Sequence, residues 1–206
     1  MTAARFIVFE GGEGAGKSTQ SSALADYLHA RGHRVRRTRE PGGTPAAEAI
    51  RAVLLDPANA GLDDRAEALL FVAARGDHAA RVIRPALDAG EIVVCDRYLD
   101  SSVAYQGIAR GLGAQRVADL SLWATGGLIP DLTIVLDVDP ALGLARVVGP
   151  DRLEAEPLEW HQRVRQGFLD IAAESPDRYL VLDASRPAED LAVQIATVVS
   201  DLVGDP

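Results

Sequence analysis

The sequence predicts a three-layer α/β/α fold with a five-stranded parallel sheet. Five short apolar runs rich in β-branched residues alternate along the chain with segments of helical character. The runs are continuous rather than alternating in polarity, which is typical of parallel strands covered on both faces. A glycine-rich loop joins the first run to the first helical segment. In folds of this class, ligands bind beyond the carboxyl ends of the strands.

Glycine and proline mark most of the joins between the expected elements. The first strand contains the unbroken apolar run FIVF. The second lies in the arginine-rich segment 31–39, which we expect to form a solvated turn and a strand edge. The third and fourth strands follow Gly90 and Pro130, residues that end helices and open turns. The expected strands are residues 5–10, 34–38, 91–95, 132–137 and 178–182.

Helical segments fill the intervals between these strands. One of them, 63–89, is long enough for two helices, and Gly111 and Gly113 interrupt another. The chain contains no repeat, low-complexity tract or linker, so its 206 residues indicate one domain, 1–206. The expected helical segments are 16–31, 44–56, 63–89, 100–125, 140–147, 156–173 and 187–203.

The composition narrows the class of protein. A net charge of −9 argues against non-specific binding to nucleic acid, which requires a basic face. No apolar run approaches the roughly 18–20 residues of a membrane span. The single cysteine, Cys95, excludes an internal disulfide and fits a reducing compartment. The first strand begins too early to leave room for a signal peptide, so we expect a cytoplasmic protein.

A phosphate-binding loop follows the first strand. The segment GGEGAGKS, residues 11–18, matches the pattern G-x-x-x-x-G-K-[ST] in full, between an expected strand and an expected helix. Lys17, the single lysine of the chain, would reach the β- and γ-phosphates, and the Ser18 hydroxyl would ligate Mg²⁺. The motif indicates the P-loop NTPase type of fold. We expect a nucleoside triphosphate to bind at Gly11, Gly12, Glu13, Gly14, Ala15, Gly16, Lys17, Ser18 and Thr19.

Arginines stand at the carboxyl ends of two further strands. Arg39 and Arg97 would emerge beside the phosphate-binding loop, where two guanidiniums suit a second phosphate group. Asp96 is placed to hold a water bound to Mg²⁺. A switch GTPase would need an N-K-x-D motif, which a chain with one lysine at Lys17 cannot contain. A nucleic-acid motor would need a strand-terminal D-E pair and a basic face, and the sequence has neither.

With these features the chain resembles the bacterial thymidylate kinases, which are nucleoside monophosphate kinases that pass a phosphoryl group from ATP to dTMP. The stretches that carry the resemblance run in family order over nearly the whole chain. TREPGGT and the DRY…SS.AYQG pattern are the most specific, whereas many families share the phosphate-binding loop. The matching stretches are FEGGEGAGKST, TREPGGT, EALLFVAARGDH, DRYLDSSVAYQG, PDLTIVLDVDP and DRLE.

The resemblance implies a pocket for the nucleoside of dTMP. Phe71 would stack on thymine and Arg75 would donate to its O4; the two lie one helical turn apart and share a face. Without the family match, Phe71 would be read as a core residue. Gln106 would bond the N3 edge of the base, and Tyr105 would crowd the 2′ position of the sugar. Glu13 would accept a hydrogen bond from the 3′-hydroxyl, since it must point away from the triphosphate.

The resemblance also implies phosphate and adenine contacts. Arg39 and Arg97 would hold the dTMP phosphate, and Pro41 would belong to a cis-proline turn that aims Arg39. Ser101 and Ser102 would either line the same site or cap the helix that begins near residue 100. We expect Glu10 to be structural. The adenine-side loop would be Asp183, Ala184 and Ser185.

A short lid, at about residues 146–156, would cover the transferring phosphate. Some members of the family carry an arginine inside the phosphate-binding loop, but this chain has Gly14 there, which implies that lid arginines act instead. Arg152, in DRLE, is the first choice for this role, and Arg146 would lie near adenine or on the surface. The expected catalytic residues are therefore Lys17, Asp96, Arg97 and Arg152, with Ser18 and Asp96 at the metal.

Together these features predict a Mg²⁺-dependent phosphotransferase that uses ATP and dTMP. The family is usually a homodimer, which the sequence itself does not show. Two alternatives stay open: a kinase for another small nucleotide acceptor, and a nucleotide-binding switch without transfer activity. We expect Trp123 and Trp160 to be packing residues. No role with nucleic acid or membrane is expected.

Overall fold

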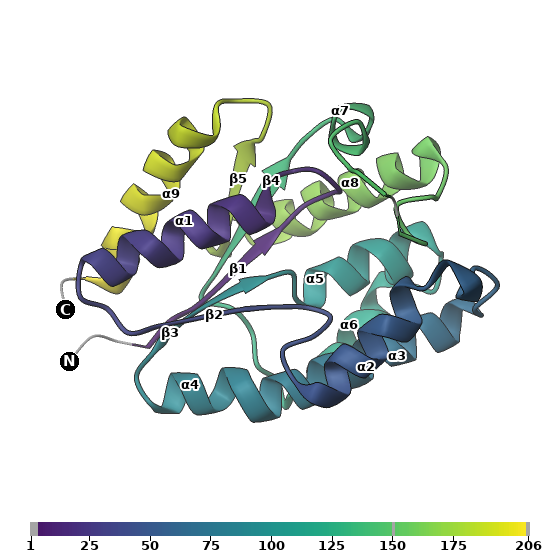
Figure 1. The fold of residues 1–206 in the computed structure, drawn as a ribbon, viewed down its shortest axis with the longest axis horizontal. Helices are drawn as coiled ribbons and strands as arrows, with labels where there is room; N and C mark the ends of the chain where they lie inside the picture. The colour runs from purple at the N-terminus through teal and green to yellow at the C-terminus, as the bar shows by residue number, and fades with distance from the viewer. Residues whose placement is uncertain (1–3, 150, 205–206) are drawn as a thin grey trace.

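The computed structural model describes residues 4–149 and 151–204, and within them the chain folds around one five-stranded parallel sheet (Figure 1). The strand order is β2-β3-β1-β4-β5, which places the first strand at the centre. Each strand lies within one residue of its expected range, so the predicted sheet is confirmed. The strands are β1 (Phe6–Glu10), β2 (Val35–Arg39), β3 (Ile92–Asp96), β4 (Leu132–Asp137) and β5 (Tyr179–Asp183).

The helices follow the expected segments, with two departures from regular α-helix. A π-helical segment, Ala79–Ile83, joins α3 to α4, so the stretch predicted as two helices runs on without a loop. A second, Val103–Ala109, continues α5. Such segments are rare and often mark functional sites. The α-helices are α1 (Lys17–Ala30), α2 (Pro45–Leu55), α3 (Asp64–His78), α4 (Arg84–Asp88), α5 (Leu99–Ser102), α6 (Ala114–Thr125), α7 (Pro140–Leu144), α8 (Leu158–Glu174) and α9 (Ala188–Val203).

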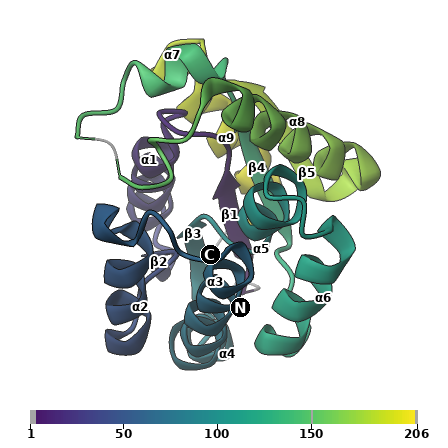
Figure 2. The ribbon, with the colours of Figure 1, turned by 90° about the vertical axis from the view of Figure 1, so that its right-hand side faces the viewer.

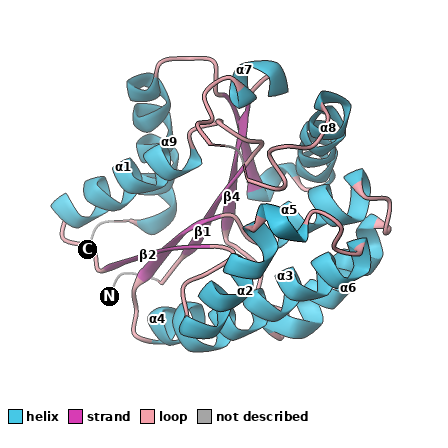
Figure 3. Ribbon diagram, turned by 45° about the vertical axis from the view of Figure 1, so that its right-hand side comes forward, coloured by secondary structure: helices cyan, strands magenta, loops and turns pink. Residues whose placement is uncertain are grey.

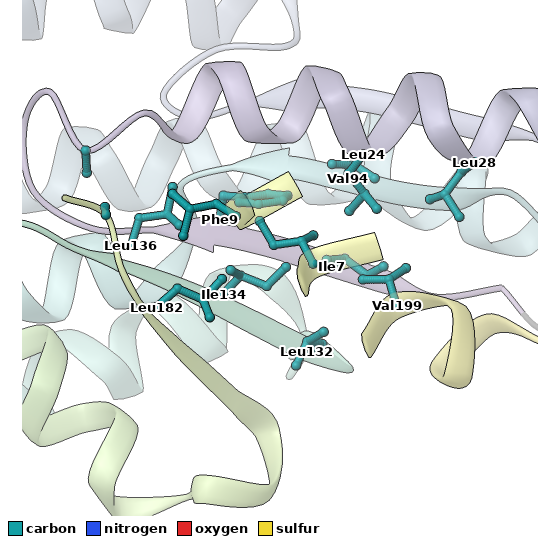
Figure 4. Packing of buried hydrophobic residues seen from close by; sticks show 14 of the residues in the cluster. Ile7, Phe9, Leu24, Leu28, Val94, Leu132, Ile134, Leu136, Leu182 and Val199 are labelled. Carbon is teal, nitrogen blue, oxygen red and sulfur yellow. The ribbon is translucent and has the colours of Figure 1, made fainter. Parts of the chain in front are cut away.

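Helices cover both faces of the sheet (Figure 3). On one face, α1 and α9 pack over Ile7 and Phe9 of β1, and Leu28 and Val199 are fully buried there (Figure 4). Burying an aliphatic or aromatic side chain of this size contributes about 1.5–3 kcal/mol, so this cluster is a main source of stability. The continuous apolar run of β1 follows from its position between two helical layers.

The other face of the sheet packs against α3 to α6 and α8. Phe6 and Val8 of β1 point this way and meet Ile83 and Tyr98. Cys95 is fully buried in this cluster, where it acts as a packing residue. Trp160 is buried too, but Trp123 is 81% exposed on α6, so the expectation that Trp123 packs in the core was wrong.

The edge strand β2 differs from the central strands. It has a neighbour only on the β3 side, and its Arg36 and Arg37 are exposed, as expected for the arginine-rich segment. The carboxyl ends of β1, β2 and β3 meet at one edge of the sheet, because Arg39 and Phe9 both stand in register with Asp96. No described helix is both long and apolar enough to cross a membrane.

Candidate active site

A pocket of about 490 Å³ opens at the carboxyl edge of the sheet. Its walls come from the loop after β1, the turn after β2, α2, α3, the segment after β3, and the stretch between α7 and α8. The expected site residues that line it are Glu13, Gly14, Gly16, Lys17, Ser18, Thr19, Arg39, Pro41, Phe71, Asp96, Arg97, Ser101, Ser102, Tyr105, Gln106 and Arg146.

The phosphate-binding loop presents a helix N-terminus to this pocket. Gly16 adopts a left-handed conformation (φ 91°), and no side chain caps the start of α1. Its first N–H groups are therefore available to an anion, as at other helix N-termini. Lys17 Nζ donates to the carbonyl oxygens of Gly11 (3.0 Å) and Gly12 (2.7 Å). Burial, followed by the charge of Arg97, lowers the pKa of Lys17 to about 8.

The loop packs directly against α7. A Cβ atom at Gly14 would lie 2.0 Å from the carbonyl oxygen of Gly143, and the φ of Gly14 is +63°. No side chain fits at this position without moving backbone. Arg146, just beyond α7, donates from Nη1 to the Gly14 carbonyl oxygen at 3.1 Å. The guanidinium of Arg146 therefore stands beside Gly14 at the phosphate-binding loop.

The Ser18 hydroxyl and the Asp96 carboxylate lie side by side at the pocket wall. Ser18 Oγ donates to Asp96 Oδ2 at 2.5 Å. A hydroxyl, a carboxylate and the oxygens of a bound triphosphate form the hard oxygen set that Mg²⁺ prefers. Among the residues described, no three histidine, cysteine or acidic side chains gather to hold a metal without substrate. The donor set therefore fits a cation brought in with a nucleotide.

Glu13 does not face the triphosphate side of the loop. Both of its carboxylate oxygens accept from Arg97 Nη2 at 2.9 Å, and Oε1 also accepts from the Tyr105 hydroxyl at 2.5 Å. Burial alone would raise the pKa of Glu13, but the charges of Arg97 and Lys17 outweigh it and lower the pKa to about 2. Glu13 is thus an anion that joins the loop to the opposite wall.

Arg97 is held in a strained conformation at the end of β3. Its φ is +68°, a region that non-glycine residues rarely occupy and that is often found at functional sites. Its Nη1 donates to the Gly11 carbonyl oxygen and to Ser101 Oγ, both at 3.1 Å. These bonds, with the Glu13 pair, fix the guanidinium at the centre of the pocket wall.

Glu10 caps α5 from the end of β1. Its Oε1 accepts from the backbone N–H groups of Tyr98 (2.8 Å) and Ser101 (3.0 Å), and its Oε2 accepts from Ser101 Oγ (2.6 Å). Burial and the neighbouring Asp100 raise the pKa of Glu10 to about 7. Ser101 and Ser102 lie inside α5, which begins at Leu99, so neither caps the helix, and both line the pocket.

Two arginines flank the turn after β2. Arg39 makes a bidentate pair with Glu48 of α2, at 3.0 and 3.1 Å. The Glu40–Pro41 peptide is cis, as the resemblance implied. Arg51 of α2 donates to the Pro41 carbonyl oxygen at 2.9 Å and lines the pocket. Arg51 was not predicted as a site residue. It lies four residues after the buried Ala47 and three before the buried Leu54, a spacing that places Arg51 on the inward face of α2.

Arg75 lies behind the pocket wall rather than on its surface. It is 2% exposed, and four of its five N–H donors bond Glu40, Ser102, Ser121 and the Tyr98 carbonyl oxygen. Glu40 and Ser102 line the pocket, whereas Arg75 is not among the lining residues described. The resemblance implied that Arg75 donates to O4 of thymine, whereas the structure places its guanidinium behind the wall with four donors already bonded.

Arg152 is directed away from the phosphate-binding loop, contrary to the expected role. Its Nε donates to the Leu54 carbonyl oxygen at 2.9 Å, and its Nη1 pairs with Glu67 at 2.6 Å. The stretch between α7 and α8 reaches towards α2, which brings these partners together (Figure 2). A buried guanidinium must be paired, and Glu67, which is fully buried, provides the carboxylate. Of the two lid arginines, Arg146 lines the pocket and Arg152 does not.

The remaining expected nucleotide contacts lie outside the pocket lining. Asp183 ends β5 and accepts from the Ser185 N–H at 2.9 Å in the turn that follows, which contains Ala184 and Ser185. Gly11, Gly12 and Ala15 act through the backbone or by packing and do not line the pocket. The expected lid includes Pro150, which lies outside the described residues.

The chain is similar to known thymidylate kinases over nearly its whole length. The thymidylate kinase family model matches residues 9–195. The thymidylate kinase of Deinococcus radiodurans is 51% identical over 204 residues, which are 98% of each chain. That of Leifsonia xyli subsp. xyli is 54% identical over 92% of this chain and 91% of its own. The crystal structure of thymidylate kinase from Ehrlichia chaffeensis matches with a TM-score of 0.81 and 34% identity, over 96% and 99% of the two chains.

Proposed function

This chain belongs to the thymidylate kinase family, and we propose from that premise how its own side chains bind the two substrates and assist transfer. The enzyme phosphorylates dTMP to dTDP at the expense of ATP. One observation carries the assignment of residues: Glu13 of the phosphate-binding loop bonds Arg97 and Tyr105 of the opposite wall. The Glu13 side chain therefore lies between the donor and acceptor sites.

ATP binds with its phosphates on the N-terminus of α1. The uncapped N–H groups and Lys17 supply positive charge, and Lys17 leaves the loop carbonyl oxygens to contact the β- and γ-phosphates. Ser18 and Asp96 would hold Mg²⁺, which is supported by the 2.5 Å contact between them at the pocket wall. When bound, the cation would supply positive charge beside the phosphate oxygens.

The phosphate of dTMP lies among Arg39, Arg51 and Arg97. These three guanidiniums line one pocket, and dTMP competes with Glu48 and Glu13 for two of them. Glu13 turns to the 3′-hydroxyl when Arg97 takes the phosphate. Thymine lies against the half-buried ring of Phe71 with its N3 edge towards Gln106, and Tyr105 crowds the 2′ position of the sugar.

Transfer needs no covalent intermediate. An oxygen of the dTMP phosphate attacks the γ-phosphorus in line, the bond from the γ-phosphorus to the β–γ bridging oxygen breaks, and ADP leaves with that oxygen. Because the attacking phosphate is already anionic, it requires no strong base. Arg146 provides the lid cation, since its guanidinium lies at Gly14. It stabilises charge on the transferring group together with Lys17 and Arg97.

One assay distinguishes this proposal from its two alternatives. ADP release from Mg·ATP is measured with dTMP, dUMP, dCMP, UMP, AMP and GMP. We expect dTMP to stimulate release most. Preference for a ribonucleotide would indicate another kinase, and release that no monophosphate stimulates would indicate a nucleotide-binding switch.

A homodimer is supported by apolar side chains on α3 and α6. Leu69 is 56% exposed and Trp123 is 81% exposed, and the two helices that carry them pack together. Light scattering coupled to gel filtration should give a dimer mass for the wild type and a monomer for Trp123→Arg. A monomeric wild type would overturn this assignment.

A cytoplasmic location follows from the chemistry of the substrates and is supported by the free thiol of Cys95. Fractionation of cells of the source organism with an antibody against this chain tests it. Recovery in the membrane or secreted fraction would contradict it.

A further inference from the structure

Glu67 of α3 is a fully buried carboxylate that the mechanism above does not use. Three side chains from distant parts of the chain donate to it. Gln106 Nε2 lies 3.0 Å from Oε1, Arg152 Nη1 lies 2.6 Å from Oε2, and Arg110 Nη2 lies 3.3 Å from Oε2. A buried acid with this many donors has a positioning role as well as a packing one.

The charge of Glu67 determines which end of the Gln106 amide faces it. A carboxylate between two guanidiniums accepts hydrogen bonds and cannot donate them. The NH₂ group of Gln106 must therefore point to Glu67, and an amide turned by 180° would place oxygen against oxygen. Gln106 lines the pocket, so the amide oxygen is the group left for the base. With its NH₂ group turned to Glu67, Gln106 presents its amide oxygen, a hydrogen-bond acceptor, to the N3 edge of the base.

We propose that Glu67 is a specificity-determining residue that locks Gln106 as an acceptor and thereby excludes cytosine. This inference rests on the proposed function, because it assumes that the N3 edge of the base meets Gln106. Thymine and uracil carry a hydrogen on N3 and satisfy the fixed acceptor. Cytosine has a lone pair on N3, so two acceptors would meet in a buried site, an arrangement that discriminates strongly.

The same carboxylate ties the lid to the base site. Arg152 belongs to the turn Asp151–Glu154, and Asp151, Leu153 and Glu154 line the pocket. The turn is seated on Glu67 through Arg152 Nη1. The Arg152–Glu67 pair therefore helps to keep Glu67 charged, and the charged carboxylate keeps the Gln106 amide in one orientation.

The test compares Glu67→Gln with wild type in ADP-release assays on dTMP, dUMP and dCMP at saturating Mg·ATP. A glutamine at 67 can donate as well as accept, so the Gln106 amide becomes free to turn and to donate to cytosine N3. We expect the kcat/KM ratio of dCMP to dTMP to rise at least about tenfold. The ratio of dUMP to dTMP should stay within about twofold, because both bases carry N3–H.

Two further variants separate positioning from structural damage. The double variant Glu67→Gln/Arg152→Met removes both charges of the buried pair together, so neither is left unpaired. Arg110 retains its ion pairs with Asp64 and Glu156. The double variant should show the same rise. In the Gln106→Leu background, Glu67→Gln should no longer change the dCMP ratio, because the residue through which it acts is gone.

Glu156→Gln is the matched control. Glu156 pairs with Arg110 Nη1 at 2.7 Å, and no hydrogen bond joins it to Gln106 within the described part of the chain, so its loss should leave both ratios unchanged. Unchanged dCMP ratios in both Glu67 variants, with active enzyme, would overturn the role of Glu67. A wild type that does not phosphorylate dTMP would instead overturn the proposed function.

Discussion

Both carboxylate oxygens of Glu13 lie 2.9 Å from Nη2 of Arg97. This pair joins the phosphate-binding loop to the segment that follows β3. It accounts for an acid inside a phosphate-binding loop, since the carboxylate is turned towards a guanidinium and away from the triphosphate side. Because the carboxylate points away from the triphosphate side, a mutation of Glu13 can be used to test the acceptor site without altering the ATP site.

Glu13→Ala should weaken dTMP binding far more than ATP binding. The change removes a charge-assisted hydrogen bond worth about 1.5–3 kcal/mol, which corresponds to a roughly 10–100-fold rise in KM for dTMP. Steady-state kinetics with each substrate varied in turn measures the effect. A rise confined to the KM for ATP would show that the carboxylate serves the donor instead.

Arg146 and Arg152 should behave differently when replaced. Arg146→Ala removes the lid cation at Gly14 and should lower kcat by about 10²–10³, the effect typical of losing one group that stabilises transition-state charge. Arg152→Ala breaks a buried pair and should lower the free energy of unfolding by about 3 kcal/mol. Single-turnover rates and urea unfolding measure the two effects, and a catalytic defect in Arg152→Ala with normal stability would reverse the assignment.

The activity should fall at alkaline pH through Lys17. Its pKa in the free enzyme is lowered to about 8, so the ammonium loses its proton as the pH rises through that value. The neutral amine cannot balance phosphate charge, and kcat/KM for ATP, which reports on the free enzyme, should decline above about pH 8. Binding of ATP stabilises the ammonium, so kcat should hold to higher pH. Parallel declines of kcat and kcat/KM would contradict this.

Gly14→Ala should destabilise the protein, and Gly12→Ala should not. A Cβ at Gly14 would lie 2.0 Å from the Gly143 carbonyl oxygen, whereas nothing lies within 4 Å of a Cβ at Gly12. Strain of this kind costs on the order of 1–3 kcal/mol. Thermal unfolding without ligands makes the comparison. Equal melting temperatures for the two variants would mean that the loop does not pack on α7 as closely as described.

The base selectivity should be uneven between two analogues of dTMP. dUMP lacks only a methyl group, worth roughly 1–3 kcal/mol, so it should be a poor but detectable substrate. dCMP presents the wrong hydrogen-bond pattern to Gln106 and should be nearly inert. Steady-state ADP release with each monophosphate decides the matter, and equal turnover of dCMP and dTMP would overturn the assignment of Gln106.

Much of this fold is determined locally, which is why the sequence was sufficient to predict it. The strands lie within one residue of their expected ranges because apolar runs and glycine or proline joins are short-range signals. The placement of Lys17 and Ser18 at the start of a helix follows in the same way from the loop motif and its flanks. The exposed edge strand around Arg36 was likewise predicted from its high content of arginine.

The directions of long side chains were decided only by tertiary structure. Arg146 and Arg152 stand in the same irregular stretch, and nothing local distinguishes them. Arg152 pairs with the buried carboxylate of Glu67 and so points away from the phosphate-binding loop. Because Gly143 packs closely against Gly14, Arg146 lies beside that loop. Charged groups in a low-dielectric interior must meet a partner, and that partner is distant in sequence. The sequence by itself determined the sheet, the loop and the chemistry, and packing decided which arginine faces the pocket.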